Sequence, residues 1–500
     1  MKRSCGVLLP IASLPSRYGI GSFSESAYDF VDWLSDSGQT YWQILPLGPV
    51  GYGDSPYQSF STFAGNPYFI SLESLIEKGF LTESECEEAD FGVNEESIDY
   101  EKLYINRYPL LKKAYSRANL DGDKFYKNFI EENNFWLEDY ALYMALKEMY
   151  NGKEWTEWEP DIKLRKSEAI NYYKTKLAEK TGFHKFLQYE FYFQWKSLKE
   201  YANNKGIQII GDIPIYVAFD SADTWSDPHL FQLDCNNEPL AVAGCPPDGF
   251  SETGQLWGNP LYDWTYHKET GYKWWISRLK QCFSLYDVVR IDHFRGFDEY
   301  YSIPYGAKTA VNGHWEKGPG MELFREVRKI LGDQKVIAED LGFMTDSVRE
   351  LVKESGFPGM KVLEFAFDSR DSGCRNDYLP HNYNKNCVAY TGTHDNQTIV
   401  SWFDTISEEE QTMARDYLCD YYTPEDKLNK VFISLLMRSS ADTVIIPMQD
   451  YLGYDDSSRI NTPSTLGNNW KWRMKKDVLT DELKDDIKKI SVLYGRNRNY

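Results

Sequence analysis

A short apolar run that ends in charged residues, VVRIDHFRGF at positions 288–297, carries the side chains most suited to chemistry. Its β-branched residues predict a buried parallel strand. Because residues two apart on a strand share a face, Arg290 and Asp292 should project the same way. An adjacent Arg lowers the pKa of a carboxyl and keeps it ionised. An ionised Asp292 at a strand end could attack a sugar carbon, although a structural ion pair explains this segment equally well.

A second carboxylate follows the next predicted strand, in VIAEDLG at positions 336–342. The apolar neighbours Ile337 and Ala338 should raise the pKa of Glu339 toward neutrality, as a proton donor to a glycosidic oxygen requires. In isolation, an ordinary exposed strand-end carboxylate would be the better explanation of Glu339. Asp340 should point away from Glu339, and we expect it to be a structural acceptor.

A third acidic motif, TGTHDNQT at positions 391–398, places His394 beside Asp395. The two could form a buried pair, contact a metal, or bind sugar hydroxyls. With seven His in the chain and no HxH or HExxH spacing, a metal is the least favoured reading, and we expect neither metal nor cofactor. We favour Asp395 as the group that holds the hydroxyls of a distorted sugar ring. A Ser-His-Asp hydrolase is disfavoured because the chain has no GxSxG motif, and Ser55 lies in a turn-like segment.

The elements that must position these residues are eight short apolar runs with amphipathic helices between several of them. Alternating strands and helices predict parallel βαβ units, and eight strands favour a closed (β/α)8 TIM barrel of the α/β class. No GxGxxG or P-loop follows the first run, which disfavours a nucleotide-binding sheet. In a barrel the catalytic groups lie at the carboxyl ends of the strands, where these acidic residues cluster. The runs span residues 6–10, 41–47, 207–215, 287–294, 335–342, 360–368, 387–395 and 442–450.

Three helices are predicted from apolar residues at helical spacing. For the first, Ser22 and Glu25 suggest a capping box and Gly38 a stop. The predicted buried faces are Ala27, Phe30, Val31 and Leu34; Leu323, Phe324, Val327, Ile330 and Leu331; and Leu428, Val431, Phe432, Leu435 and Leu436.

Two intervals between strands are too long for simple crossovers. Within a single catalytic barrel spanning residues 1–500, we expect a mainly helical insertion subdomain at 55–205, after the second strand. A second, irregular insertion at 216–286 follows the third strand and includes a candidate active-site loop at 245–255. Long loops of this kind are often lids or binding loops, although a family-specific ornament would also fit.

Composition narrows the class of partner. A formal net charge of −21 disfavours nucleic acid and anionic membranes as partners. The eight cysteines are scattered and form no CxxC, so we expect reduced thiols in a cytoplasmic protein. Pro10 and Pro15 interrupt the first apolar run, which is too short for a signal peptide, and no run reaches transmembrane length. No pattern indicates an oligomeric state.

In this order, the acidic motifs resemble those of the 4-alpha-glucanotransferases (amylomaltases or disproportionating enzymes, glycoside hydrolase family 77), relatives of the α-amylases. The likeness covers essentially the whole chain. It includes LPLGPVGYGDSPYQSFSTFAGNPY, GDIPIYVAFDSADTW, VAGCPPDGFSETGQLWGNPLYDW and QDYLGYDDSSRINTPSTLGNNWKWR. The resemblance implies transfer of a segment of an α-1,4-glucan to the 4-hydroxyl of an acceptor glucan or glucose, by a retaining double displacement. It implies maltooligosaccharide, starch or glycogen substrates. The alternatives are an amylase-type α-1,4-glucan hydrolase and a non-catalytic glucan-binding protein.

The resemblance also implies roles for individual residues. Asp292 matches the nucleophile, Glu339 the general acid/base, and Asp395 the transition-state stabiliser. Arg290 and His394 match positions that line the subsite where the bond breaks. Phe250 matches the tip of a flexible loop over the acceptor sites. The segment GDIPIYV departs from the calcium-associated pattern of α-amylases, as this family does, so no metal is implied. Further matches to sugar-contacting segments are Asp212, Ser55, Tyr57, Trp257, Asp368, Gln449 and Asn461.

Overall fold

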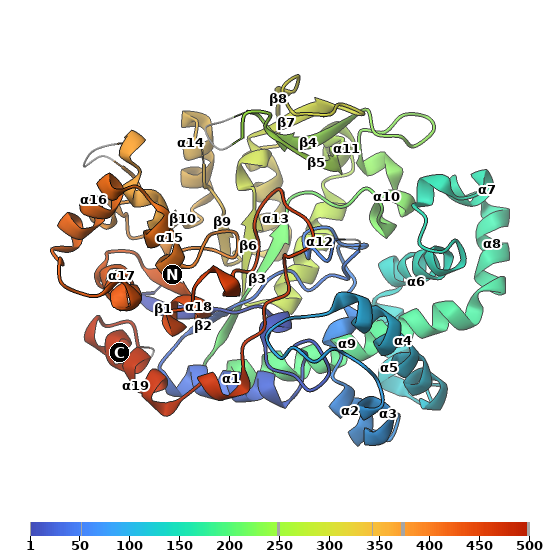
Figure 1. Cartoon of the computed structure of the whole chain (residues 1–500). Helices are drawn as coiled ribbons and strands as arrows, with labels where there is room; N and C mark the ends of the chain where they lie inside the picture. The colour runs from blue at the N-terminus through green and yellow to red at the C-terminus, as the bar shows by residue number, and fades with distance from the viewer. Residues whose placement is uncertain (1, 52, 248–250, 343, 372–375, 498–500) are drawn as a thin grey trace.

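Each of the eight apolar runs overlaps one strand of a parallel barrel (Figure 1). The computed structural model describes residues 2–51, 53–247, 251–342, 344–371 and 376–497. The strands pair in the order β10-β11-β12-β1-β2-β3-β6-β9, and Ala338 N–H donates to Pro358 O at 2.9 Å across the seam between β9 and β10. The predicted (β/α)8 barrel is confirmed. Its strands are β1 (Ser4–Leu8), β2 (Tyr41–Gln43), β3 (Gln208–Pro214), β6 (Val288–Asp292), β9 (Val336–Ala338), β10 (Gly359–Val362), β11 (Cys387–Tyr390) and β12 (Thr443–Pro447).

The barrel interior is apolar toward the amino ends of the strands and charged toward their carboxyl ends. Ile210 of β3 and Val288 of β6 belong to one buried cluster with residues of the other strands. Because side chains alternate along a strand, the next inward positions are Asp212 and Arg290, which lie opposite each other in the register. Val289 and Ile291 face outward into the core between strands and helices. The charged layer therefore sits on a packed apolar layer at the carboxyl end of the barrel.

Helices cover the outside of the barrel. The predicted faces lie on α1 (Glu25–Asp36), α13 (Met321–Leu331) and α17 (Leu428–Arg438), but Ile330 is 57% exposed and does not belong to its face. Gly38 follows α1 with φ +76°, as predicted for a stop. The capping box was wrong, because α1 begins after Ser24, whose side chain makes no capping hydrogen bond. The remaining barrel helices include α12 (Lys273–Leu285), α14 (Asp346–Ser355), α15 (Ile399–Thr405), α16 (Glu408–Leu418), α18 (Met448–Leu452) and α19 (Asp481–Leu493).

Between β2 and β3 the chain forms a group of helices to one side of the barrel (Figure 1). The helices from residue 134 to residue 176 share an aromatic core of their own, which includes Trp136, Tyr143 and Trp155 and also Trp225 of α10 (Ala222–Ser226), whereas the helices from residue 72 to residue 117 pack into the main core. The last helix, α9 (Ala178–Asn204), runs into the barrel wall, where Trp195 joins the main core. The others are α2 (Leu72–Glu77), α3 (Glu83–Glu87), α4 (Tyr100–Arg117), α5 (Lys124–Glu132), α6 (Asn134–Met149), α7 (Pro160–Lys163) and α8 (Ser167–Lys176).

A second sheet, which the sequence did not predict, lies at the top of Figure 1. Its antiparallel order is β5-β4-β7-β8, formed by β4 (Ala241–Cys245), β5 (Gln255–Pro260), β7 (Glu299–Pro304) and β8 (His314–Lys317). The segment expected to be irregular thus contributes β4, β5 and the helices α10, α11 (Trp264–Glu269) and α12. The candidate loop 245–255 joins β4 to β5, and Phe250 within it lies outside the described residues.

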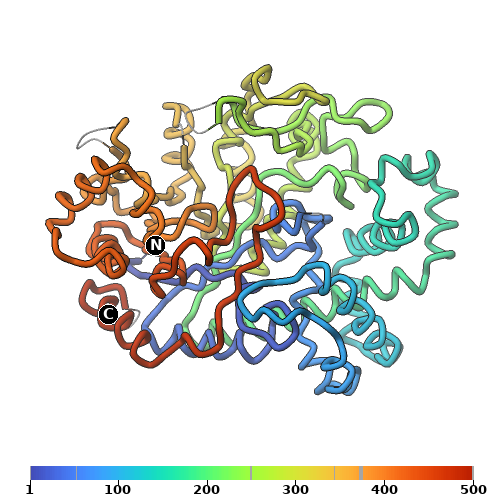
Figure 2. The backbone as a smooth tube through the Cα atoms, viewed as in Figure 1, coloured from blue at the N-terminus to red at the C-terminus, as the bar shows by residue number. Residues whose placement is uncertain are grey.

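The C-terminal part of the chain passes back over the N-terminal part (Figure 2). Met474 N–H donates to Ser13 O at 2.8 Å, and Arg473 N–H donates to Glu96 O at 2.9 Å. Residues 455–474 therefore pack across the barrel top. In the described part of the chain, no helix combines the length and apolar character that crossing a membrane requires.

Candidate active site

Arg290 ties two carboxylates together at the carboxyl end of the barrel. Its Nη1 donates to Asp212 Oδ2 at 2.6 Å and its Nη2 donates to Asp292 Oδ1 at 2.8 Å. Arg290 and Asp212 are buried, whereas 30% of the Asp292 side chain is exposed. The prediction that Arg290 and Asp292 project the same way is confirmed. Of this buried network, only Asp292 is accessible to a substrate.

The pKa of Asp292 is raised to about 6, because burial outweighs every other influence. Arg290 and His394 lower it, and the negative charges of Asp212 and Asp395 raise it. Arg290 lowers this pKa, as expected, but its effect is smaller than that of burial. Arg290 limits the effect of burial, so that the carboxylate is mostly ionised at neutral pH.

Glu339 lies one residue beyond β9 and is held by two backbone N–H groups. His293 N–H donates to Oε2 at 2.7 Å, and Leu341 N–H donates to Oε1 at 2.8 Å. His293 can donate in this way because the chain turns there with φ +53°, in the left-handed region, directly after Asp292. Burial, reinforced by the charge of Asp292, raises the pKa of Glu339 to about 7. The predicted upward shift is confirmed.

Asp340 points elsewhere, as predicted. Its Oδ1 accepts the Met360 N–H at 2.6 Å, so it joins the end of β9 to β10. Asp340 is therefore a structural acceptor beside Glu339.

Asp395 lies in a loop, because β11 ends at Tyr390. Its Oδ1 accepts from Asn461 Nδ2 at 2.6 Å, and its Oδ2 lies 3.3 Å from His394 Nε2. Arg459 holds the backbone of the same residue, since Nη2 donates to Asp395 O at 2.8 Å. With 41% of its side chain exposed, Asp395 remains open to a ligand.

Tyr57 joins the Asp212 side of the site to the His394 side. Its hydroxyl donates to Asp212 Oδ2 at 2.6 Å, and His394 Nε2 lies 2.9 Å from the same oxygen. Since the hydroxyl proton goes to Asp212, His394 Nε2–H is the donor in the second contact. The Tyr57 and His394 rings stack with centroids 5.3 Å apart. Trp470 packs against both rings, at 5.8 and 6.0 Å.

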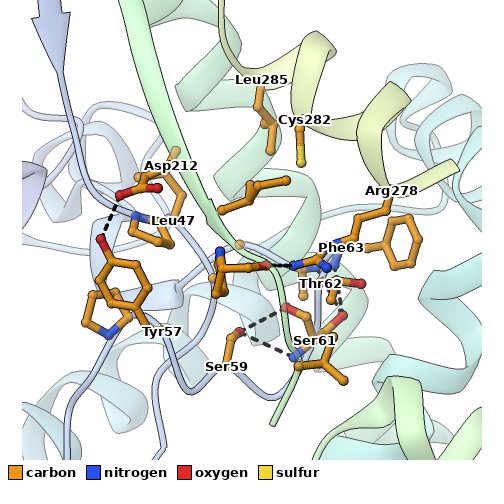
Figure 3. Close-up of a pocket in the computed structure, with 18 of the residues that line it drawn as sticks. Leu47, Tyr57, Ser59, Ser61, Thr62, Phe63, Asp212, Arg278, Cys282 and Leu285 are labelled. Carbon is orange, nitrogen blue, oxygen red and sulfur yellow. Dashed lines mark hydrogen bonds between the residues drawn. The ribbon is translucent and has the colours of Figure 1, made fainter. Parts of the chain in front are cut away.

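A small cavity lies behind Tyr57 and Asp212 (Figure 3). Its volume of about 60 Å³ is enough for a few water molecules. Asp212 Oδ1 is buried and has no hydrogen-bond partner among the described residues. A sugar therefore has to approach Asp292 and Asp395 from their exposed side.

The other residues predicted from the sequence make no described hydrogen bond to Asp292, Glu339 or Asp395, apart from those named above. Trp257, on β5, contacts the His293 ring edge to face at 4.8 Å. Ser55 Oγ accepts the Tyr57 N–H at 3.3 Å and so shapes the turn before Tyr57. Gln449 is buried in α18, and its Nε2 donates to Ser458 O at 3.1 Å. The Asp368 carboxylate is held by Arg370, at 2.9 and 2.7 Å, and no described contact joins it to the carboxylates above.

Three residues of this site were not identified from the sequence: His293, Arg459 and Trp470. His293 acts through its backbone, and its left-handed conformation leaves no signal in residue type. Arg459 and Trp470 come from a segment far along the chain, so their proximity depends on tertiary packing. No group of three or more His, Cys, Asp or Glu suited to a metal ion occurs in the described ranges.

Comparisons with known proteins agree on one family. A family model described as 4-alpha-glucanotransferase matches residues 9–480. A 4-alpha-glucanotransferase of Clostridium butyricum is 53% identical over 97% of this chain and 99% of its own length. One of Streptococcus pneumoniae is 50% identical over 99% of this chain and 98% of its own. The solved amylomaltase of Streptococcus agalactiae, in complex with acarbose, has a TM-score of 0.96 at 43% identity and covers 99% of this chain and 100% of its own.

Proposed function

The chain belongs to the 4-alpha-glucanotransferases of glycoside hydrolase family 77, and we propose that it transfers a segment of an α-1,4-glucan to the 4-hydroxyl of an acceptor glucan or glucose. One observation carries this proposal: two carboxyls with pKa values near 6 and 7 stand at the ends of the adjacent strands β6 and β9. At neutral pH such a pair supplies one carboxylate and one carboxylic acid, as glycosyl transfer with retention requires.

In the first step Glu339 gives its proton to the leaving glycosidic oxygen while Asp292 attacks the anomeric carbon. The bond to the leaving oxygen breaks, a covalent glycosyl ester forms on Asp292, and the shortened glucan or glucose leaves. Asp395, oriented by Asn461, holds the ring hydroxyls as the sugar distorts. Arg290 keeps Asp292 sufficiently acidic to remain ionised until it attacks.

In the second step the ionised Glu339 takes the proton of the incoming 4-hydroxyl. The new oxygen attacks the anomeric carbon from the face that the leaving group vacated, and Asp292 is released. The His293 and Leu341 N–H groups favour the carboxylate form that this step needs, whereas burial favours the acid form that the first step needs. Glu339 is thus balanced between the two forms.

Transfer requires that an acceptor sugar reach the ester in preference to water. We assign this task to the segment between β4 and β5, because it leads into the strand whose Trp257 contacts the His293 ring. We also assign the enzyme to the cytoplasm, which is supported by the seven described cysteines, all free of disulfides.

Incubation with maltotriose tests the proposed function. A transferase produces a ladder of maltooligosaccharides longer than the substrate, together with glucose, whereas an amylase-type hydrolase produces only shorter sugars. The Asp292→Asn variant, which keeps the shape of the side chain, is the control and should form no ladder. If no product of the wild-type enzyme is longer than maltotriose, the chain is not a transferase. A ladder that persists unchanged in Asp292→Asn would remove Asp292 from the mechanism.

A further inference from the structure

The loop that carries Asp395 rests on a buried carboxyl that the mechanism above does not use. Glu364 lies just beyond β10, in the 3-10 turn Leu363–Phe367, and is 8% exposed. Its Oε2 accepts from Asn396 Nδ2 at 3.1 Å, and its backbone N–H donates to Thr391 O at 3.3 Å. Glu364 therefore contacts the loop 391–398 at both its beginning and its middle.

Asn396 connects Glu364 to Asp395 through hydrogen bonds with Thr393. Its Oδ1 accepts the Thr393 N–H at 2.9 Å and the Thr393 hydroxyl at 2.8 Å, which closes the turn 393–396. Thr393 Oγ1 in turn accepts the Asp395 N–H at 3.3 Å. A continuous chain of hydrogen bonds thus runs from Glu364 through Asn396 and Thr393 to the backbone of Asp395.

The Glu364 carboxyl also fills the space beneath the loop. A Cβ added to Gly392 would lie 2.5 Å from Glu364 Oε1, so the loop backbone packs directly on the carboxyl. A shorter side chain at position 364 would leave a void there and would deprive Asn396 Nδ2 of its acceptor.

We propose that Glu364 is a positioning residue: acting through Asn396, it fixes the turn 393–396 and so the orientation of the Asp395 carboxylate toward the sugar. The inference rests on the proposed function, because it assumes that Asp395 stabilises the transition state. Its structural part, the fixing of the loop by Glu364, can be measured without any reaction.

The surroundings of Glu364 favour the neutral form of its carboxyl. Burial raises its pKa well above the ordinary range, the charges of Asp450 and Asp456 act in the same direction, and Asn396 and Arg459 oppose them. Both aspartates bind the same loop: Asp450 accepts from the Thr391 hydroxyl and from Ile399 N–H, and Asp456 accepts from Gln397 Nε2 and Thr398 N–H. Glutamine is its closest substitute, because it keeps the volume and the oxygen that accepts from Asn396 and carries no charge.

Three variants of one position test the proposal by steady-state kinetics with maltotriose. Glu364→Gln should keep kcat within about 3-fold of the wild type, because it retains the acceptor, the volume and the neutrality. Glu364→Asp and Glu364→Ala should lower kcat by about 10- to 100-fold with little change in KM, because they misplace a group that acts in the transition state. The proposal is overturned if Glu364→Ala retains kcat, or if Glu364→Gln is as impaired as Glu364→Ala.

The route through Asn396 has its own test. If Glu364 acts through Asn396, the double variant Glu364→Ala/Asn396→Ala should lose no more kcat than the more impaired single variant. Losses that multiply would show that the two residues act separately. Asp223→Asn is the matched control, since this buried carboxylate accepts from Thr62 outside the loop and should leave kcat unchanged.

Amide hydrogen exchange over residues 391–398 separates failure of this inference from failure of the proposed function. Exchange should rise in Glu364→Ala and stay at the wild-type level in Glu364→Gln, whatever reaction the enzyme catalyses. Unchanged exchange in Glu364→Ala would refute the fixing of the loop. Thermal unfolding confirms that each variant is folded.

Discussion

The ion network of Asp212, Arg290 and Asp292 illustrates how one side chain can serve both folding and chemistry. Arg290 is a buried cation that contacts two carboxylates, and removing one member of such a group costs several kcal/mol because it leaves buried charge uncompensated. Within this network Arg290 also lowers the pKa of Asp292 and so limits the rise that burial causes. Under the proposed mechanism, a structural ion pair and a catalytic carboxylate, which were alternatives at the level of sequence, share the same residues.

The two shifted carboxyls predict a bell-shaped dependence of kcat/KM on pH. Activity should rise as Asp292 loses its proton near pH 6 and fall as Glu339 loses its proton near pH 7, with the maximum between these values. Because the two groups interact, the two limbs report the pair and not either residue alone. Initial rates with maltotriose at low concentration, measured from pH 4.5 to pH 9 in steps of about 0.5, check the profile.

The Glu339→Gln variant tests whether Glu339 causes the fall of kcat/KM at alkaline pH. Maltosyl fluoride has a leaving group that needs no proton, so this variant should still release a burst of fluoride, and the burst should not decline at alkaline pH. A burst that declines as steeply as the wild-type profile would show that another group is responsible.

At the level of strands and helices, close packing determines where the charged residues stand. Gly211 lies between Ile210 and Asp212 on β3, and a Cβ at this position would overlap the ring of Tyr286, which ends α12. Glycine is required here for the close approach of a helix end to the barrel, not for backbone conformation.

Gly211→Ala should therefore lower both stability and activity. We expect the free energy of unfolding to fall by about 1–3 kcal/mol, and kcat to fall because Asp212 is displaced together with β3. Denaturant unfolding and maltotriose kinetics measure the two effects. Gly122→Ala is the matched control, since a Cβ there meets nothing within 4 Å, and it should change neither quantity. Equal stability of the two variants would contradict the packing argument.

The strands were predictable because most residues of each buried barrel strand are apolar, and the runs are short. The second sheet was not, because β4 pairs with β7, a strand that comes after β6 in the sequence, and β5 pairs, among the described strands, only with β4. The acidic residues at strand ends could be selected from sequence because barrel topology brings such ends together. The roles of His293 and Trp470 could not be predicted from the sequence. The role of His293 depends on its left-handed backbone conformation, and that of Trp470 on packing between distant segments, and local spacing shows neither.

Across the whole molecule, the beginning and the end of the described chain are joined under the barrel. Arg496 is fully buried and donates hydrogen bonds to backbone carbonyls, while Arg3 Nε donates to Tyr494 O at 2.8 Å. The acceptors of Arg496 include Met437 O at 2.7 Å, Ala441 O at 2.9 Å and Ser4 O at 3.0 Å. Met437 lies in the last turn of α17, Ala441 lies two residues before β12, and Ser4 is the first residue of β1.

Arg496→Met should destabilise the fold without changing the active site. Several buried carbonyls would lose a charged donor, and we expect the free energy of unfolding to fall by about 3 kcal/mol. Arg438→Met, at an exposed position, is the control and should have little effect. Thermal unfolding and kcat per folded enzyme are the measurements. A normal unfolding temperature in Arg496→Met would show that water replaces the guanidinium at no cost.

The strand order has a consequence for synthesis of the protein. β1 pairs with β2 on one side and with β12 on the other, yet β1 ends at Leu8 and β12 begins at Thr443. A ribosome adding about 5–20 residues per second needs roughly 20–90 s to cover that interval. Throughout that time the nascent chain exposes an apolar strand edge that nothing yet covers. Until its last barrel strand emerges, the chain is open to wrong pairing at this edge, whatever the stability of the finished enzyme.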